Sequence, residues 1–111
     1  MNSDGKKKIF VVTDELKAFL DVQSVTVQQR FHEIVEVLEK DGFLALPYGK
    51  KLSGYPNLFE IRILSGGNVR VFYCYFEAEY VVGVSGFIKK SMKTPKKEIQ
   101  KALKLIKNLE V

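Results

Sequence analysis

The sequence predicts an α+β domain, a small antiparallel sheet with helices packed on one face, in the order β-α-α-β-β-β-α. Three segments with strand-like alternation follow one another in residues 58–90 and are separated by short turns. Segments with helical apolar spacing precede and follow them. A length of 111 residues suits one domain. We expect that domain to span residues 9–111 and the basic segment 1–8 to be flexible.

A short strand and a short helix open the predicted domain. Residues 9–12 (IFVV) are a β-branched run that is typical of a strand. In residues 13–22, Leu16, Phe19 and Leu20 recur at helical spacing, which predicts a helix with one apolar side.

A longer helix is predicted over residues 26–42. Thr26 and Gln29 have the spacing of a capping box, in which each side chain pairs with a free backbone N–H group. Gly42 can adopt the left-handed conformation that ends many helices. The helix carries one apolar stripe, made of Val27, Phe31, Ile34, Val35 and Leu38.

Three strands of a meander are predicted next. Residues 43–57 are rich in Pro, Gly and Tyr and are expected to form a loop. Residues 58–64 alternate apolar and charged side chains, which is the pattern of a strand with one buried face. A glycine turn at residues 65–68 leads to a second arm at 69–76, and a third strand is expected at 80–90.

The chain is predicted to end in a helix. Thr94 suits the N-cap position, and Pro95 suits the first helical position. The buried stripe is expected to consist of Ile99, Ala102, Leu103, Ile106 and Leu109.

Composition excludes several classes of protein. No apolar run approaches the ~18 residues of a membrane span. The apolar stretch that follows the basic first residues is too short for a signal peptide, so we expect a cytoplasmic protein that does not bind membranes. The single cysteine, Cys74, excludes an internal disulfide. One cysteine and one histidine argue against a structural zinc site, and neither a metal nor a cofactor is expected.

Positive charge is concentrated in the second half of the chain. Residues 1–57 carry 8 Lys/Arg and 8 Asp/Glu, whereas residues 58–111 carry 10 Lys/Arg and 5 Asp/Glu, which gives the whole net charge of +5. Clustered cations attract polyanions at long range. A solvated basic surface without a partner would show the same composition, so both interpretations stay open.

The strand pattern brings several cations onto one face of the sheet. Period-two alternation places Arg62 and Arg70 opposite the apolar residues of their strands, on a face that we expect to be open. Lys89 or Lys90 at the end of the next strand would join them. Guanidinium groups suit phosphate because they donate two parallel hydrogen bonds. Alternatively, Glu60 pairs across the strands with one of the arginines, and the cluster is only structural.

Four aromatic residues could stack on bases of single-stranded nucleic acid: Tyr48, Tyr55, Phe72 and Phe87. We retain Tyr48 and Phe87 as candidate RNA-binding residues. Packing in a core or a loop is the alternative, and it is favoured for Phe72 and Phe87.

Four motifs carry a resemblance to a known family. They are "KKLSG", "LFEIRI", "NVRVFY" and "GFIKKSMKTPKKEIQKAL". In this order and spacing they resemble the RelE/HigB toxin superfamily, in particular its phage-derived HigB-like branch. The resemblance covers residues 9–110, nearly the whole chain.

The resemblance implies a RelE-like fold and the toxin of a type II toxin–antitoxin pair. Such toxins cleave mRNA on the ribosome without a metal. The ribose 2′-hydroxyl attacks its own 3′-phosphate, and a cyclic phosphate and a 5′-hydroxyl are left. The implied partners are the ribosome, mRNA and a helix-turn-helix antitoxin encoded beside the toxin, with which it could form a hetero-oligomer.

The resemblance also assigns roles to residues. Arg70 matches the arginine that stabilises the phosphate, and Arg62 matches a second arginine of the family. Lys50 and Lys51 match a basic loop that supplies a base or binds the backbone. Lys89 matches the basic end of the strand, and these five residues form the expected catalytic set.

The lysines that follow this strand, Lys90 and Lys93, are expected to bind RNA. The chain departs from the family because it has no tyrosine or histidine after Tyr80, where many members have a proton-transfer group. Its single histidine, His32, lies beside the apolar stripe of the first long helix, where a surface or packing role is expected. A non-catalytic binding module of the same fold, such as a gyrase inhibitor or an inactivated phage-derived toxin homologue, is therefore the alternative function.

Overall fold

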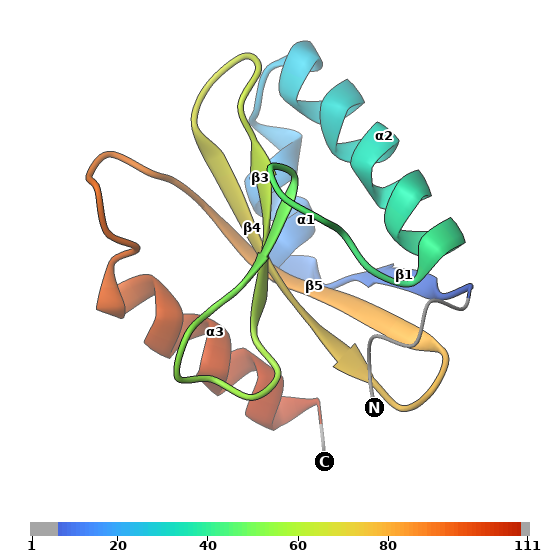
Figure 1. The fold of residues 1–111 in the computed structure, drawn as a ribbon. Helices are drawn as coiled ribbons and strands as arrows, with labels where there is room; N and C mark the ends of the chain where they lie inside the picture. The colour runs from blue at the N-terminus through green and yellow to red at the C-terminus, as the bar shows by residue number, and fades with distance from the viewer. Residues whose placement is uncertain (1–6, 110–111) are drawn as a thin grey trace.

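A computed structural model describes residues 7–109 of the chain. A five-stranded sheet runs through the molecule, with helices against both of its faces (Figure 1). Most of the segment expected to be flexible lies outside the described residues. Its last residue, Lys8, is buried, and its Nζ donates a hydrogen bond of 2.6 Å to the carbonyl oxygen of Ala78.

The sheet has the strand order β1-β5-β4-β3-β2. The central strands β3 (Phe59–Ile63), β4 (Val69–Phe76) and β5 (Tyr80–Ile88) form the predicted antiparallel meander. The edge strand β1 (Ile9–Val12) is parallel to β5, so the sheet is mixed rather than wholly antiparallel. The other edge strand, β2 (Gly49–Lys51), lies inside the segment predicted as a loop and pairs antiparallel with β3.

Strand β5 contains a β-bulge. The register of β4 and β5 shifts by one residue between Phe72 and Tyr73, which leaves Val84 without a partner. Val82 on one side of the inserted residue and Phe87 on the other side belong to the same buried cluster. An odd spacing on one face is possible only because the inserted residue changes the alternation of the strand.

The helices cover both faces of the sheet. Helices α1 (Asp14–Asp21) and α2 (Val25–Asp41) lie on one face, and α3 (Lys96–Asn108) lies on the other (Figure 1). The α+β class is confirmed, but the expectation that helices pack on one face only is wrong. The physical reason is that both faces of the central strands carry apolar side chains, which water would otherwise reach.

Each face of the sheet has its own core. Under α1 and α2, the core includes Leu16, Phe31, Leu38, Ile61, Val71 and Tyr73. Under α3, the core includes Leu58, Phe72, Cys74, Val82, Val84 and Ala102. The sheet therefore holds two hydrophobic layers together, and most residues of β4 are buried on both sides.

The capping residues differ slightly from the predicted ones. The N-cap of helix α2 is Ser24, two residues before the predicted Thr26, and the Oγ of Ser24 accepts a hydrogen bond of 3.2 Å from the N–H group of Val27. Thr26 and Gln29 therefore lie inside the helix. Gly42 ends the helix with φ of 82°, as predicted.

Helix α3 begins one residue later than predicted. Its N-cap is Pro95 rather than Thr94, and no side chain caps its first turn. Ile99 and Ala102 are buried as expected, whereas Leu103 is 37% exposed. No helix within residues 7–109 has the length and apolar character needed to cross a membrane.

Candidate nucleic-acid interface

A cavity of about 460 Å³ opens on the α3 side of the sheet. It lies between the β2–β3 edge and the segment that leads into α3. Five charged side chains line it: Lys50, Glu60, Arg62, Lys89 and Lys93. We call this cavity the cationic cleft, because four of these five side chains are basic.

Strand register accounts for three of the charged residues. Lys50 of β2 lies opposite Glu60 of β3, and the period of two places Glu60 and Arg62 on the same face of their strand. Across the next pair of strands, Arg62 lies directly opposite Arg70. The cleft floor is therefore built on the paired strands β2, β3 and β4, with β2 at the edge of the sheet.

The segment after β5 supplies the other two lysines. The backbone N–H group of Lys89 donates to the carbonyl oxygen of Asn68 at 2.8 Å, and Asn68 Nδ2 donates back to Lys89 O at 3.1 Å. Further along, the hydroxyl of Ser91 donates to the carbonyl oxygen of Lys93 at 2.9 Å. The β3–β4 turn thus fixes the point at which the chain leaves the sheet.

Arg70 lies beneath the cleft rather than in it. Its alternation with Val69 and Val71 was predicted correctly, but the expectation of an open face is wrong, because its side chain is only 4% exposed. Its Nη1 donates to the carbonyl oxygen of Val69 at 3.3 Å. Burial lowers the pKa of Arg70, Glu60 opposes that shift, and Arg62 adds to it.

Glu60 is the buried anion between the two arginines. Its side chain is 3% exposed, and its Oε1 lies 3.7 Å from the Nε of Arg70 and 3.9 Å from the Nε of Arg62. Within the described residues, neither Nε nor the Oε2 of Glu60 has a hydrogen-bond partner. The sequence suggested a pair between Glu60 and one arginine, and the structure shows contacts with both.

Two of the predicted lysines do not line the cleft. Lys51 is exposed, and its Nζ donates to the carbonyl oxygen of Tyr55 at 2.8 Å. Lys90 is also exposed, one residue beyond Lys89. Both lysines are exposed and therefore accessible to a partner.

The two candidate stacking residues are also outside the cleft. Phe87 is only 6% exposed and packs against Phe72, with ring centroids 5.2 Å apart, so its face is not available to a base. Tyr48 is 52% exposed, but it borders a pocket with Arg30 and Val37 of α2, on the opposite side of the sheet.

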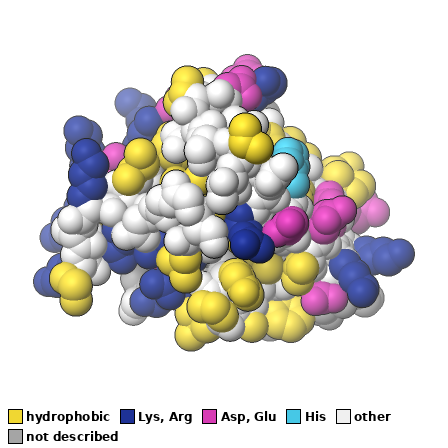
Figure 2. Space-filling model, turned by 90° about the horizontal axis from the view of Figure 1, so that it is seen from above, with side chains coloured by type: hydrophobic (Ala, Val, Ile, Leu, Met, Phe, Trp, Pro, Cys, Tyr) yellow, Lys and Arg dark blue, Asp and Glu magenta, His cyan; other side chains and the backbone are white. Residues whose placement is uncertain are grey.

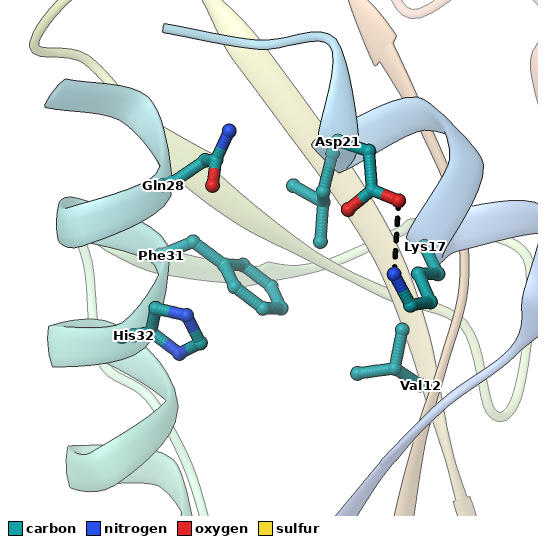
Figure 3. A pocket seen from close by; sticks show the side chains of 7 residues that line it. Val12, Lys17, Asp21, Gln28, Phe31 and His32 are labelled. Carbon is teal, nitrogen blue, oxygen red and sulfur yellow. Dashed lines mark hydrogen bonds and ion pairs between the residues drawn. The ribbon is translucent and has the colours of Figure 1, made fainter. Parts of the chain in front are cut away.

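His32 lies far from the cationic cleft in the fold. It borders a separate cavity of about 320 Å³ between α1 and α2, together with Phe31 and the ion pair of Lys17 and Asp21 (Figure 3). Its ring meets that of Phe31 edge-on, with centroids 5.8 Å apart. His32 therefore has the surface and packing position that the sequence predicts.

The residues that line the cleft without having been placed there from the sequence include Tyr55, Met92 and Thr94. Tyr55 follows β2, and the other two belong to the segment before α3. No pattern within either segment shows that they meet, because their proximity depends on how α3 packs on the sheet.

Charge is divided between the two sides of the molecule. Figure 2 shows basic side chains gathered on the side that carries α3, whereas acidic side chains gather near the single histidine on the α2 side. Among the described residues, no group of three or more His, Cys, Asp or Glu could hold a metal ion. The charged groups that line the cleft are three ammonium groups, one guanidinium group and the carboxylate of Glu60.

Residues 18–107 match the family described as "Phage derived protein Gp49-like". The chain belongs to the Gp49-like family. No curated protein matches this Gp49-like chain. Its fold is similar to that of a mutant of the E. coli toxin RelE in the free state, with a TM-score of 0.71 and 15% identity, over 90% of this chain and 98% of that chain. The predicted RelE-like fold is confirmed by this likeness, and the predicted phage-derived family is confirmed by the family match.

Proposed function

We propose that this Gp49-like chain is a toxin that cleaves mRNA on the ribosome by a metal-independent reaction. The observation that carries the proposal is the cationic cleft, in which Lys50, Arg62, Lys89 and Lys93 converge on one cavity. A phosphodiester backbone is the common biological ligand for such a set of donors. Membership of a phage-derived family and the fold of a known toxin support the same function.

The proposed reaction needs charge stabilisation and two proton transfers. The 2′-oxygen forms a bond to phosphorus and gives its proton to solvent water, while the bond from phosphorus to the 5′-oxygen breaks and that oxygen takes a proton from an ammonium group of the cleft, which solvent then reprotonates. Arg62 and Lys50 would stabilise the charge that develops on the phosphate oxygens. The ammonium group of Lys89 or Lys93 would protonate the leaving oxygen.

Partners follow from the proposed function. The exposed lysines around the cleft, including Lys51 and Lys90, would bind phosphates of mRNA or ribosomal RNA. A helix-turn-helix antitoxin encoded beside the toxin would cover or distort the cationic cleft in a hetero-oligomer. Such a substrate and partner place the activity in the cytoplasm.

A non-catalytic binding module of the same fold is the second candidate. Two observations favour it. The residues that line the cleft include no histidine, and Arg70, which the family resemblance assigns to the phosphate, is buried. Such a module would bind an anionic partner through the same cleft and leave RNA intact.

Inducible expression with and without the neighbouring gene tests the proposal. A toxin should arrest growth, the neighbouring product should relieve the arrest, and mapped mRNA ends should show new cleavage sites. Lys50→Ala should weaken cleavage, because Lys50 lines the cleft. Lys40→Ala is the matched control, because Lys40 is an exposed lysine in the last turn of α2. Growth arrest without new mRNA ends would favour the binding module.

A further inference from the structure

A buried carboxylate at the floor of a cationic cleft needs an explanation, because an anion there opposes the binding of phosphate. We propose that Glu60 is a positioning residue, which orients Arg62 toward the phosphate that is cleaved. This inference rests on the proposed function. Glu60 itself takes no part in bond making or breaking.

The geometry makes Glu60 a shared counterion. Arg62 and Arg70 lie directly opposite each other on adjacent strands, and like charges in that position repel. The Oε1 of Glu60 is 3.9 Å from one Nε and 3.7 Å from the other, so one oxygen faces both guanidinium groups. The carboxylate therefore allows two cations to occupy neighbouring positions under and within the cleft.

The three residues leave one positive charge and unused donors. Two guanidinium groups and one carboxylate sum to +1, and the Nε of each arginine lacks a hydrogen-bond partner among the described residues. Buried donors without partners are rare in folded proteins, and each one calls for an explanation, of which a functional role is one. The natural complement of this cluster is one anion with several acceptor oxygens.

Arg62 is the member of the cluster that can reach such an anion. Its side chain is 28% exposed and lines the cleft, whereas Arg70 is 4% exposed and does not line it. A guanidinium has two distinct edges. The Oε1 of Glu60 faces the Nε of Arg62, so the terminal nitrogens of Arg62 are the donors that can contact two phosphate oxygens.

Glu60 is badly placed to act as the base instead. A general base must come within hydrogen-bond distance of the proton that it takes. The side chain of Glu60 is 3% exposed, and its unpaired Oε2 is buried. The arginine cluster, rather than the ribose hydroxyl, is therefore within its reach.

The test compares Glu60→Gln and Glu60→Asp with the wild-type protein. Gln keeps the size of the side chain and removes its charge, whereas Asp keeps the charge and withdraws it by one methylene. Binding is measured with a 2′-O-methyl oligonucleotide, which cannot be cleaved, and kcat with ribosomes programmed with mRNA. Folded fractions come from melting curves.

A second variant guards against a failure to fold, because Glu60→Gln alone leaves two cations unbalanced. It combines Glu60→Gln with Arg70→Met, so the buried pair is removed together and the protein should fold.

We expect Glu60→Gln to lower kcat by about 10- to 100-fold, because a misplaced donor loses transition-state contacts. Its Kd for the oligonucleotide should stay equal or fall, because one negative charge has left the cleft. Glu60→Asp should recover part of kcat, and the double variant should fold and remain slow. A purely structural role would lower activity only in proportion to the folded fraction.

Wild-type kcat in folded Glu60→Gln, or in the double variant, would overturn the positioning role. A loss fully explained by the folded fraction would overturn it too. The proposed function fails separately, when the wild-type protein itself leaves mRNA on ribosomes uncut.

Discussion

Both faces of the sheet are buried, but they carry different kinds of side chain. The face under α1 and α2 carries an apolar and aromatic core, with Phe59 and Tyr73 stacked at 5.4 Å between ring centroids. The face under α3 combines an apolar cluster with Glu60, Arg70 and Ser85, three of the four buried polar or charged residues in the described part of the chain. Burial alone therefore does not show whether a residue serves stability or function. The chemical nature of the buried side chains distinguishes the two.

The largest expected effect on folding belongs to the α1–α2 face. Leu16 is fully buried there and packs close to Gly83 of β5. Leu16→Ala should lower the free energy of unfolding by about 2–5 kcal/mol, because it leaves a cavity in a close-packed layer. Denaturant titration measures this, and kcat per folded molecule should be unchanged. A lower kcat in fully folded Leu16→Ala would mean that this face also determines the shape of the cleft.

Arg62→Ala should show the opposite pattern. We expect the cleavage rate to fall by about 10²-fold, because a donor to the developing phosphate charge is lost. Arg62 is partly exposed and its Nε is unpaired, so the melting temperature should change little. The measurement is single-turnover cleavage beside a melting curve, with Arg30→Ala on the exposed surface of α2 as a control. An unstable Arg62→Ala would show that this arginine supports the fold instead.

Arg70→Ala tests the burial that the sequence did not predict. A surface arginine could be truncated at a cost within ~0.5 kcal/mol. Because Arg70 is buried against Glu60, we expect Arg70→Ala to lower the free energy of unfolding by about 1–3 kcal/mol. Thermal and denaturant unfolding check the value, and Lys90→Ala, which changes an exposed cation, should leave it unchanged. Wild-type stability in Arg70→Ala would contradict the buried ion cluster.

The smallest expected effect concerns salt. Binding of a 2′-O-methyl oligonucleotide should weaken steeply as salt rises, because phosphate contacts release counterions. Lys89→Ala should reduce the slope of log K against log salt by about 1, because it removes one such contact. Lys40→Ala, on α2, should not change the slope. An affinity that does not vary with salt would mean that the cleft does not bind phosphates.

Strand periodicity predicted the side-chain facing well. Alternation alone placed Arg62 and Arg70 on the same face, because successive side chains in a strand point to opposite sides. It could not show what covers that face. The apolar stripe of α3 indicates that the helix is buried, but not against which side of the sheet. Phe72 and Cys74, apolar neighbours of Arg70 on the same face, were the available signal that this side is also a core.

The candidate site was predicted only in part for the same reason. Arg62 and Lys89 were placed by a strand and a strand end, Lys50 was named only from the family resemblance to a basic loop, and the structure brings all three together. Tyr48 and Phe87 were chosen for their chemistry, and tertiary packing places them elsewhere. The proposed role of Glu60 depends on two distances of less than 4 Å, one to Arg62 in the same strand and one to Arg70 in the next strand, which no one-dimensional pattern contains.

The inserted residue Val84 changes which side chains of β5 point to which face of the sheet. Without that extra residue, every later side chain of β5 would exchange faces, because alternation has a period of two. Lys89 would then leave the cleft, and Phe87 would leave its place beside Phe72. The chain between Val84 and Lys89 should therefore tolerate changes of residue identity far better than changes of residue number.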